Sequence, residues 1–260
     1  MRKKARRSST SPVMRVGSKR LIVRADPYYE RARSPRLKKK VWNQDMIEDV
    51  EAILFDFDGT LAPNLDLVGM RQSIIDYSLE CGVTSEVFAN QYIVEIIDAS
   101  SDWLAKNPQV IDAIDYARCA NKIVVDFEMD SAAKTKPFNG VRQMLSELIE
   151  RGVKSGVVTR NCREAVLQTF PDLLSYVNSL HARDDVEHIK PDPRHLNASL
   201  MSLGVTPEST LLVGDGALDM RVGKQLGLYC VGVLSGSGGR DDLQLAGADV
   251  VIADCLDLTR

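Results

Sequence analysis

The sequence of this 260-residue chain predicts an α/β fold: a parallel sheet covered by helices on both faces, with an inserted all-helical cap. Two features predict it. Beyond residue 45, short apolar runs alternate with segments of helical periodicity, as is typical of parallel strands joined by helices. The stretch 62–136 interrupts this alternation with three helical segments and no clear strand, which an insertion after the first strand explains.

Each expected element follows from a local pattern. The apolar runs predict strands at 52–57, 154–159, 177–181, 210–214, 229–234 and 248–252. Phe138–Arg151 is amphipathic with Gly152 as its stop, and a second helix, Asp192–Leu203, ends at Gly204. We therefore expect three parts, namely a basic tail over 1–45, a Rossmann-like core from 46–61 and 137–260, and the helical cap over 62–136.

The tail differs physically from the rest of the chain. Residues 1–40 carry fifteen Lys and Arg against Asp26 and Glu30, whereas the other residues carry 18 basic and 34 acidic side chains. The tail has few large apolar residues, so we expect it to be mostly disordered. It could be a solvated extension, bind polyanions such as nucleic acid or an anionic membrane, direct organelle import, or fold back on the acidic body.

Composition restricts the class of protein. An apolar fraction of 44% supports a proper core, and no apolar stretch approaches the roughly eighteen residues that a membrane span needs. The cysteines show no CxxC spacing and their number is odd, which argues against a zinc site or a disulfide framework. We therefore expect a reducing, cytoplasmic location, with an organelle as the alternative. The five cysteines are Cys81, Cys119, Cys162, Cys230 and Cys255.

The most informative motif follows the first expected strand. The apolar run Ile53–Phe55 leads directly into Asp56 and Asp58, and Gly59 indicates a turn that re-aims Asp58. Two carboxylates at the end of a buried strand are costly unless they are paired, hydrogen-bonded or bound to a metal. An ordinary turn would also use Asp and Gly, so this segment alone leaves both interpretations open.

Three further motifs follow the later apolar runs. In the first, Thr159 ends the second apolar run and Asn161 opens a helix. In the second, Lys190 directly precedes Pro191. In the third, Asp215 and Asp219 follow the apolar run Leu211–Val213. Singly, each is ordinary, because such residues also cap helices, carry surface charge or form turns. In this order they resemble the haloacid dehalogenase superfamily of phosphohydrolases over about residues 50–255. A helical cap between the first two motifs resembles its phosphoglycolate phosphatase and β-phosphoglucomutase branch.

This resemblance implies a role for each residue. Asp56 would be the nucleophile that forms an aspartyl-phosphate, and Asp58 the acid and base for the leaving alcohol and the attacking water. Mg²⁺, which prefers oxygen ligands, would be the cofactor. Asp219 would orient either the metal's waters or Lys190. The implied catalytic set is Asp56, Asp58, Thr159 and Lys190, the phosphate-binding set is Thr159, Arg160, Asn161 and Lys190, and the metal set is Asp56, Asp58 through its main-chain carbonyl, Asp215 and Asp219.

The function that we expect is a Mg²⁺-dependent phosphatase acting on a small phosphorylated metabolite, a phosphoglycolate-like phosphomonoester. A mutase of the β-phosphoglucomutase kind would use the same Asp pair, whereas a dehalogenase would need neither Asp58 nor a metal. From another class, the tail could make the chain a nucleic-acid-binding or scaffolding protein.

Departures from the branch pattern leave the substrate open. Ala62-Pro63-Asn64 stands where the branch usually has an acidic residue and a serine. Gly216 stands at a second position where the branch usually has a serine. In the cap, Arg71, Arg118 and Lys122 could contact an anionic substrate or could be solvated helix charges. The three histidines show no metal-ligand pattern.

Overall fold

The computed structural model describes residues 47, 49–88, 91–108 and 111–260 of the chain. The predicted basic tail, 1–45, therefore lies outside the described residues. Within those ranges, no helix has both the length and the hydropathy that crossing a bilayer requires.

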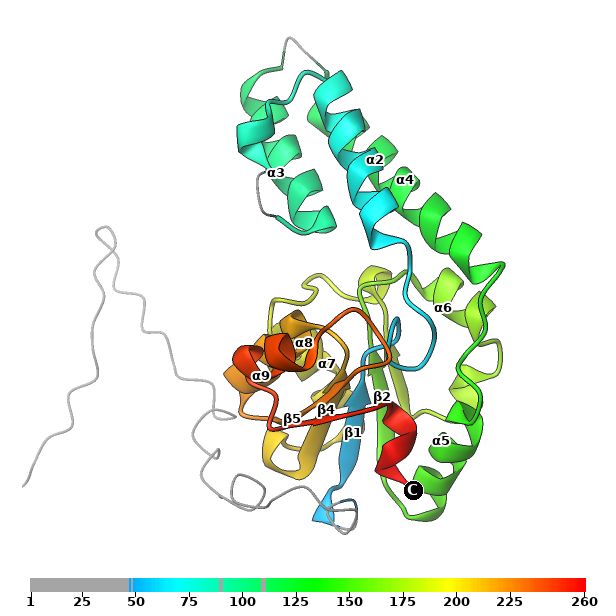
Figure 1. The fold of residues 1–260 in the computed structure, drawn as a ribbon. Coiled ribbons are helices and arrows are strands. Elements are labelled where there is room, and N and C mark those ends of the chain that lie inside the picture. Colours follow the sequence, from blue (N-terminus) through cyan, green and yellow to red (C-terminus); the bar gives the residue numbers. More distant parts are fainter. Residues whose placement is uncertain (1–46, 48, 89–90, 109–110) are drawn as a thin grey trace, which may run out of the picture. The chain divides into compact units, whose positions relative to one another are not determined.

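The core is a parallel sheet of six strands in the order β3-β2-β1-β4-β5-β6 (Figure 1). This arrangement confirms the predicted α/β fold class. The strands are β1 (Ala52–Phe55), β2 (Lys154–Val158), β3 (Ser179–His181), β4 (Thr210–Gly214), β5 (Tyr229–Val233) and β6 (Val250–Ile252).

All but one of the strands are shorter than the apolar runs suggested, because hydrogen bonding rather than hydropathy sets strand ends. β1 ends at Phe55, since the amides of Leu61 and Ala62 fold back onto the carbonyl of Phe57 in a turn. β3 begins only at Ser179, because a turn bonds the Val177 amide to the carbonyl of Leu173. Phe57 is nevertheless buried, so the apolar pattern predicted its burial correctly.

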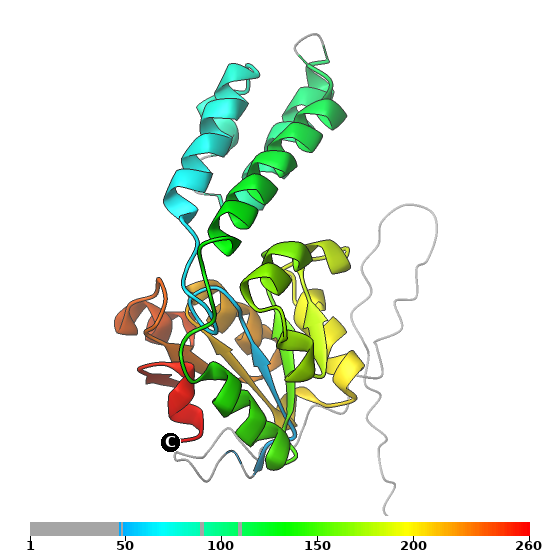
Figure 2. The ribbon, with the colours of Figure 1, turned by 90° about the vertical axis from the view of Figure 1, so that its right-hand side faces the viewer.

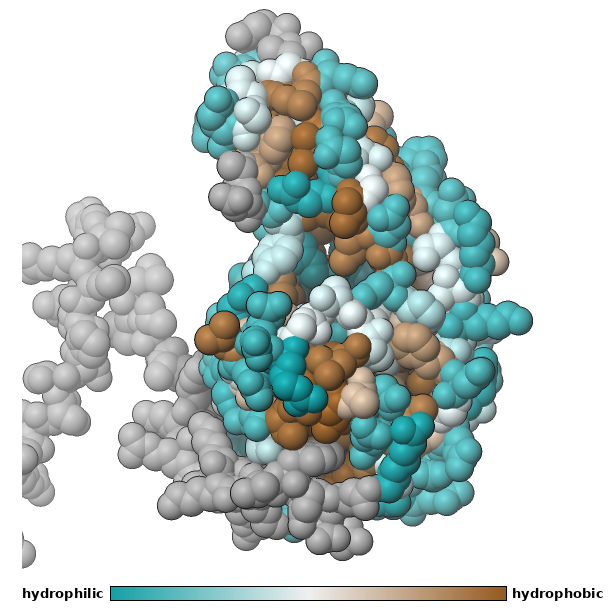
Figure 3. Space-filling model, in the orientation of Figure 1, coloured by the Kyte–Doolittle hydropathy of each residue, from teal (hydrophilic) through white to brown (hydrophobic). Residues whose placement is uncertain are grey.

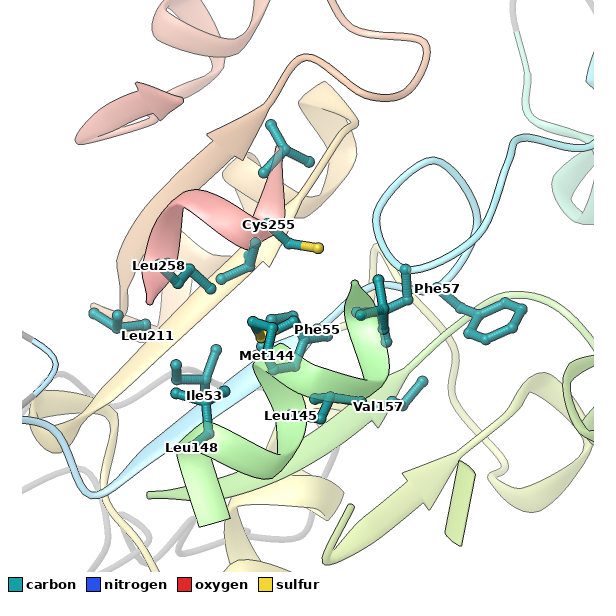
Figure 4. Close-up of a cluster of buried hydrophobic side chains, with 14 of the residues drawn as sticks. Ile53, Phe55, Phe57, Met144, Leu145, Leu148, Val157, Leu211, Cys255 and Leu258 are labelled. Carbon is teal, nitrogen blue, oxygen red and sulfur yellow. The ribbon is translucent and has the colours of Figure 1, made fainter. Parts of the chain in front are cut away.

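Helices cover both faces of the sheet. α5 (Val141–Glu150) and α6 (Arg163–Thr169) lie on one face, and α7 (Arg194–Leu203), α8 (Ala217–Leu226) and α9 (Arg240–Ala246) lie on the other. β1 shows the alternation that this requires, because Ile53 and Phe55 pack toward α5 while Ala52 and Leu54 pack toward α7 and α8 (Figure 4).

Glycines set two helix boundaries near the predicted ones. α7 ends at Gly204, whose φ of 65° closes the helix as expected. α5 begins at Val141 rather than Phe138, because Gly140 immediately before it has a φ of 93°, outside the helical region. Short 3₁₀ helices occupy several connections: η2 (Ser85–Val87), η3 (Leu173–Ser175), η4 (Arg183–Asp185), η5 (Pro207–Ser209) and η6 (Cys255–Leu258).

Between β1 and α5 the described residues form three helices and no strand. They are α2 (Leu67–Glu80), α3 (Ile93–Lys106) and α4 (Ala113–Ala132), and Figure 2 shows α2 alongside α4. These helices have an apolar core of their own. Within it Tyr77 stacks on Tyr116, and the Tyr116 hydroxyl lies 2.6 Å from the hydroxyl of Ser78. The all-helical insertion thus packs as a unit, which is consistent with a cap.

Candidate active site

The candidate site lies where the sheet order reverses. The chain runs from β1 through β2 to β3 on one side and then returns to place β4 on the other side of β1. Ligands of open α/β sheets bind beyond the carboxyl ends of the strands at such a switch point. Asp56, Thr159 and Asp215 directly follow β1, β2 and β4, which are neighbours in the sheet. The topology therefore gathers three predicted site residues at one edge.

Lys190 joins this group from the segment before α7. Its ammonium lies 2.8 Å from Asp56 Oδ1 and 2.7 Å from Asp219 Oδ1, and its side chain is only 2% exposed. Burial alone would lower the pKa of Lys190, but the carboxylates of Asp219 and Asp56 outweigh it and raise that pKa above its ordinary value. The lysine is thus held as a buried cation between the predicted nucleophile and the first turn of α8.

The carboxylates of Asp56, Asp215 and Asp219 form a compact cluster. Each offers one oxygen, and these oxygens all lie within 4.8 Å of one another. Lys190 pairs with only two of these carboxylates, Asp56 and Asp219, so the three acids of the cluster outnumber the one cation that contacts them. Burial raises the pKa of Asp56; Lys190 opposes this shift, and Asp219 and Asp215 reinforce it. An oxygen-rich, over-anionic cluster fits a hard divalent cation such as Mg²⁺.

Asp215 is fixed by backbone that comes unusually close. The amide and hydroxyl of Ser237 donate to Asp215 Oδ2 at 2.6 and 2.9 Å. A Cβ on Gly236 would lie 2.1 Å from that oxygen, and one on Gly59, whose φ is 77°, would lie 2.6 Å from Asp215 Cγ. Only glycine leaves room at both positions, so two separate loops are shaped around one carboxylate. No sequence pattern identifies Ser237 as a site residue, because it lies in a loop beyond β5.

Asp58 stands apart from the acid cluster. The Asn161 amide donates to its two carboxylate oxygens at 3.2 and 3.1 Å. Burial raises the pKa of Asp58 to about 7, Asn161 counteracts it, and the nearby Glu128 adds to it. Asn161 was predicted as a phosphate-binding residue, and its side chain contacts Asp58. The backbone N–H of Asn161 donates to Thr159 Oγ1 at 3.1 Å.

Arg160 makes contacts that the sequence did not predict. Its guanidinium pairs with Glu95 of α3 at 2.8 Å and donates to the Lys190 carbonyl at 2.9 Å. It also lies over the ring of Tyr92, 5.3 Å from the centroid. Arg160 thus links the helical insertion to the segment that carries Lys190.

His195 has a role that the sequence analysis did not assign. Its Nδ1 accepts a hydrogen bond from the Lys190 amide at 3.1 Å, and its Nε2 lies 3.1 Å from the carbonyl of His181. A neutral ring protonated on Nε2 satisfies both contacts. The ring is fully buried, and burial followed by the positive charge of Lys190 lowers its pKa to about 3. His195 therefore holds the backbone of Lys190, and only its position on the helix after Lys190 hinted at this.

A cavity of about 930 Å³ opens over these residues. Side chains from the sheet edge and from α2, α3 and α4 line it, and Figure 3 shows the surface hollowed between them. A buried ion pair of Arg183 with Glu128 joins α4 to the core beside it. Of the cap cations that the sequence offered, Arg71 lines the cavity. Arg118 and Lys122 are exposed and pair with Asp115 and Asp126 on their own helix.

Comparison with known proteins gives related enzymes. The chain is 31% identical over 219 residues to the pyrophosphatase PpaX of Anoxybacillus flavithermus, covering 81% of this chain and 95% of that protein. It is 25% identical over 231 residues to the phosphoglycolate phosphatase of Shigella boydii, covering 81% of this chain and 92% of that protein.

Solved structures share the fold at lower identity. A hydrolase from Pseudomonas syringae matches with a TM-score of 0.61 and 21% identity, over 80% of this chain and 95% of the other. The β-phosphoglucomutase of Clostridium difficile matches with a TM-score of 0.58 and 16% identity, over 80% and 93%. The family model described as haloacid dehalogenase-like hydrolase matches residues 53–233, which include every predicted site residue. The predicted resemblance is confirmed, and the chain belongs to the haloacid dehalogenase-like hydrolases.

Proposed function

We propose that the protein is a Mg²⁺-dependent phosphatase that hydrolyses a small phosphomonoester through an aspartyl-phosphate on Asp56. The observation that supports this most is the convergence of Asp56 and Asp58, Lys190, and Asp215 from three separate segments on one cavity. Relatives named as a pyrophosphatase and a phosphoglycolate phosphatase support phosphoryl chemistry of this kind. We also propose residues 46–61 and 137–260 as the catalytic core, with 62–136 as its cap.

The proposed reaction begins with attack of the Asp56 carboxylate on phosphorus, while the ester oxygen leaves on the opposite side. Asp58 gives its proton to that leaving oxygen, and the Asn161 amide holds the carboxyl in position. Asp58 then takes a proton from the water that hydrolyses the acyl phosphate. The same group serves both steps because the first leaves it as a base.

Charge neutralisation is divided between two groups in this proposal. The Lys190 ammonium, held by Asp219 and Asp56, and the Thr159 hydroxyl would stabilise the transferring phosphoryl oxygens. The carboxylates of Asp56 and Asp215, with the main-chain carbonyl of Asp58, would hold Mg²⁺. When bound, Mg²⁺ would supply positive charge between the anionic nucleophile and the anionic substrate.

The substrate that we propose to test first is phosphoglycolate-like, with pyrophosphate as a second candidate because the 31% identical relative is named a pyrophosphatase. A mutase would use the same nucleophile. Steady release of inorganic phosphate without a bisphosphate activator distinguishes hydrolysis from that alternative.

The test is a phosphate-release screen over small phosphomonoesters and pyrophosphate, with and without Mg²⁺, for the wild type and Asp56→Asn. Asparagine keeps the size of the side chain but lacks the anionic oxygen, so nearly all turnover should be lost while the fold is retained. Asp130→Asn, at an exposed position of α4, is the matched control and should behave as the wild type. Substantial phosphate release by Asp56→Asn would disprove the covalent mechanism.

A further inference from the structure

The cavity contains two arginines whose charge no described carboxylate balances. Three of its five cations are neutralised within the protein, because Lys190 pairs with Asp56 and Asp219, Arg160 with Glu95, and Arg183 with Glu128. Arg71 of α2 and Arg221 of α8 form no ion pair with any carboxylate in the described ranges. These two side chains are thus the cavity's available cations.

Both arginines converge on the start of α3. The Arg71 guanidinium approaches the carbonyl of Gln91 at 3.4 Å, and that of Arg221 donates to the hydroxyl of Tyr92 at 2.7 Å. Gln91 and Tyr92 are adjacent in the chain, so the two arginines contact neighbouring residues, Arg71 at the main chain and Arg221 at the ring hydroxyl. One comes from the helical insertion and the other from the core.

The surroundings favour an anionic partner for this pair. The wall of the cavity also includes Leu65, Met70 and Ile93, which carry no charge, and Asp242, which forms no ion pair with either arginine among the described residues. A guanidinium carries donors in a fixed fork that matches the oxygens of a carboxylate or phosphoryl group. Asp56 and Asp219 instead pair with Lys190, so the two arginines carry positive charge that remains available to a ligand.

We infer that Arg71 and Arg221 together bind a second anionic group of the substrate, a carboxylate or a further phosphoryl group, while the reacting phosphoryl group lies at Asp56. This inference rests on the proposed function and narrows its substrate class to phosphate esters or anhydrides with two anionic ends. The arginines determine specificity without touching the reacting atoms.

The experiment compares substrates that differ in the second anion. kcat/KM is measured for 2-phosphoglycolate, for pyrophosphate, and for 2-hydroxyethyl phosphate, a similar ester that lacks the second anion. The enzymes are the wild type, Arg71→Gln, Arg221→Gln and the double variant. Arg118→Gln, at the exposed cap arginine outside the cavity, is the control.

The wild type should prefer at least one of the two-anion substrates over 2-hydroxyethyl phosphate. Each single arginine variant should lower that preference by about 10- to 100-fold, the usual effect of losing a charge-assisted hydrogen bond. The substrate whose preference falls more, 2-phosphoglycolate or pyrophosphate, identifies the second anion that the two arginines bind. The control should leave the preference within about threefold of the wild-type value.

The inference is overturned if the wild type has no such preference, or if the arginine variants lose activity equally on all three substrates. Where none of the three is turned over, their inhibition constants against p-nitrophenyl phosphate give the same ratio and the same decision. Hydrolysis of p-nitrophenyl phosphate that is abolished by Asp56→Asn would leave the proposed function intact even if the arginine inference fails.

Discussion

Replacing His195 should change how the stability of the fold depends on pH. The ring is fully buried between the amide of Lys190 and the carbonyl of His181, and it accepts a proton only at the expense of the first contact. Burial, Lys190, His181 and Arg160 all disfavour the imidazolium, and the bond to the His181 carbonyl only partly offsets them. The folded state therefore holds His195 neutral, whereas the unfolded chain binds a proton below its ordinary pKa.

The size of the effect follows from the shift. A pKa lowered from 6.5 to about 3 contributes stability that is fully present above pH 6.5 and is lost as the pH falls toward 3. The whole shift corresponds to about 5 kcal/mol, at about 1.4 kcal/mol for each unit of pKa. Between pH 7 and pH 5, both above the folded pKa, the loss is about 2 kcal/mol.

The variant His195→Asn separates this titration from the contact itself. The amide oxygen can still accept from Lys190 but does not titrate, so the variant loses a constant amount of stability at every pH. The free energy of unfolding in urea is measured at pH 7 and pH 5 for both proteins. The wild type should lose about 2 kcal/mol more than the variant over this range. Other groups, including Asp58, titrate in both proteins and cancel in the difference.

His188→Asn is the matched control, since His188 is partly exposed and its nearest acidic partner, Glu187, is 89% exposed. It should show the same pH dependence as the wild type. If His195→Asn also loses stability in parallel with the wild type between pH 7 and pH 5, then His195 does not enter the fold as a buried neutral ring.

Further outcomes test the chemistry and the packing. Asp58→Asn should slow the first, single-turnover release of the alcohol from alkyl phosphates by about 10²–10⁴-fold but spare that of an aryl leaving group, and equal losses in this first step would contradict leaving-group protonation. Asp215→Ala should raise the Mg²⁺ requirement or abolish activity, and undiminished wild-type hydrolysis in excess chelator would exclude the metal role. Gly156→Ala should destabilise the fold by about 1–3 kcal/mol in urea unfolding, because its Cβ would lie 2.6 Å from Ser199 Oγ; unchanged stability would show that α7 can shift. Deleting residues 1–40 should preserve turnover and weaken any salt-sensitive binding to DNA or RNA, and a folded but inactive truncation would place the tail in the active site.

The sequence by itself predicted the features that depend on local pattern. The apolar runs before Asp56 and Asp215 identified two central strands, and the residue types at their ends indicated the acid cluster. Gly204 correctly ended α7, because a positive φ at a helix end is a property of the residue itself. The order of these motifs was also sufficient to place the chain in its family.

The tertiary structure decided which distant groups meet, because contacts between residues far apart in the chain leave no local pattern. Glu95 lies 65 residues before Arg160, and their pairing depends on how α3 approaches the core. No local pattern distinguishes His195 from an ordinary histidine, and its contact with the Lys190 amide is formed only in the folded structure. Arg71 resembled any other cap cation until the fold paired Arg118 and Lys122 with acids on their own helix and left Arg71 lining the cavity, as Arg221 does. The identity of each side chain determined which charge and hydrogen bonds it can offer, and tertiary packing determined which partner it contacts.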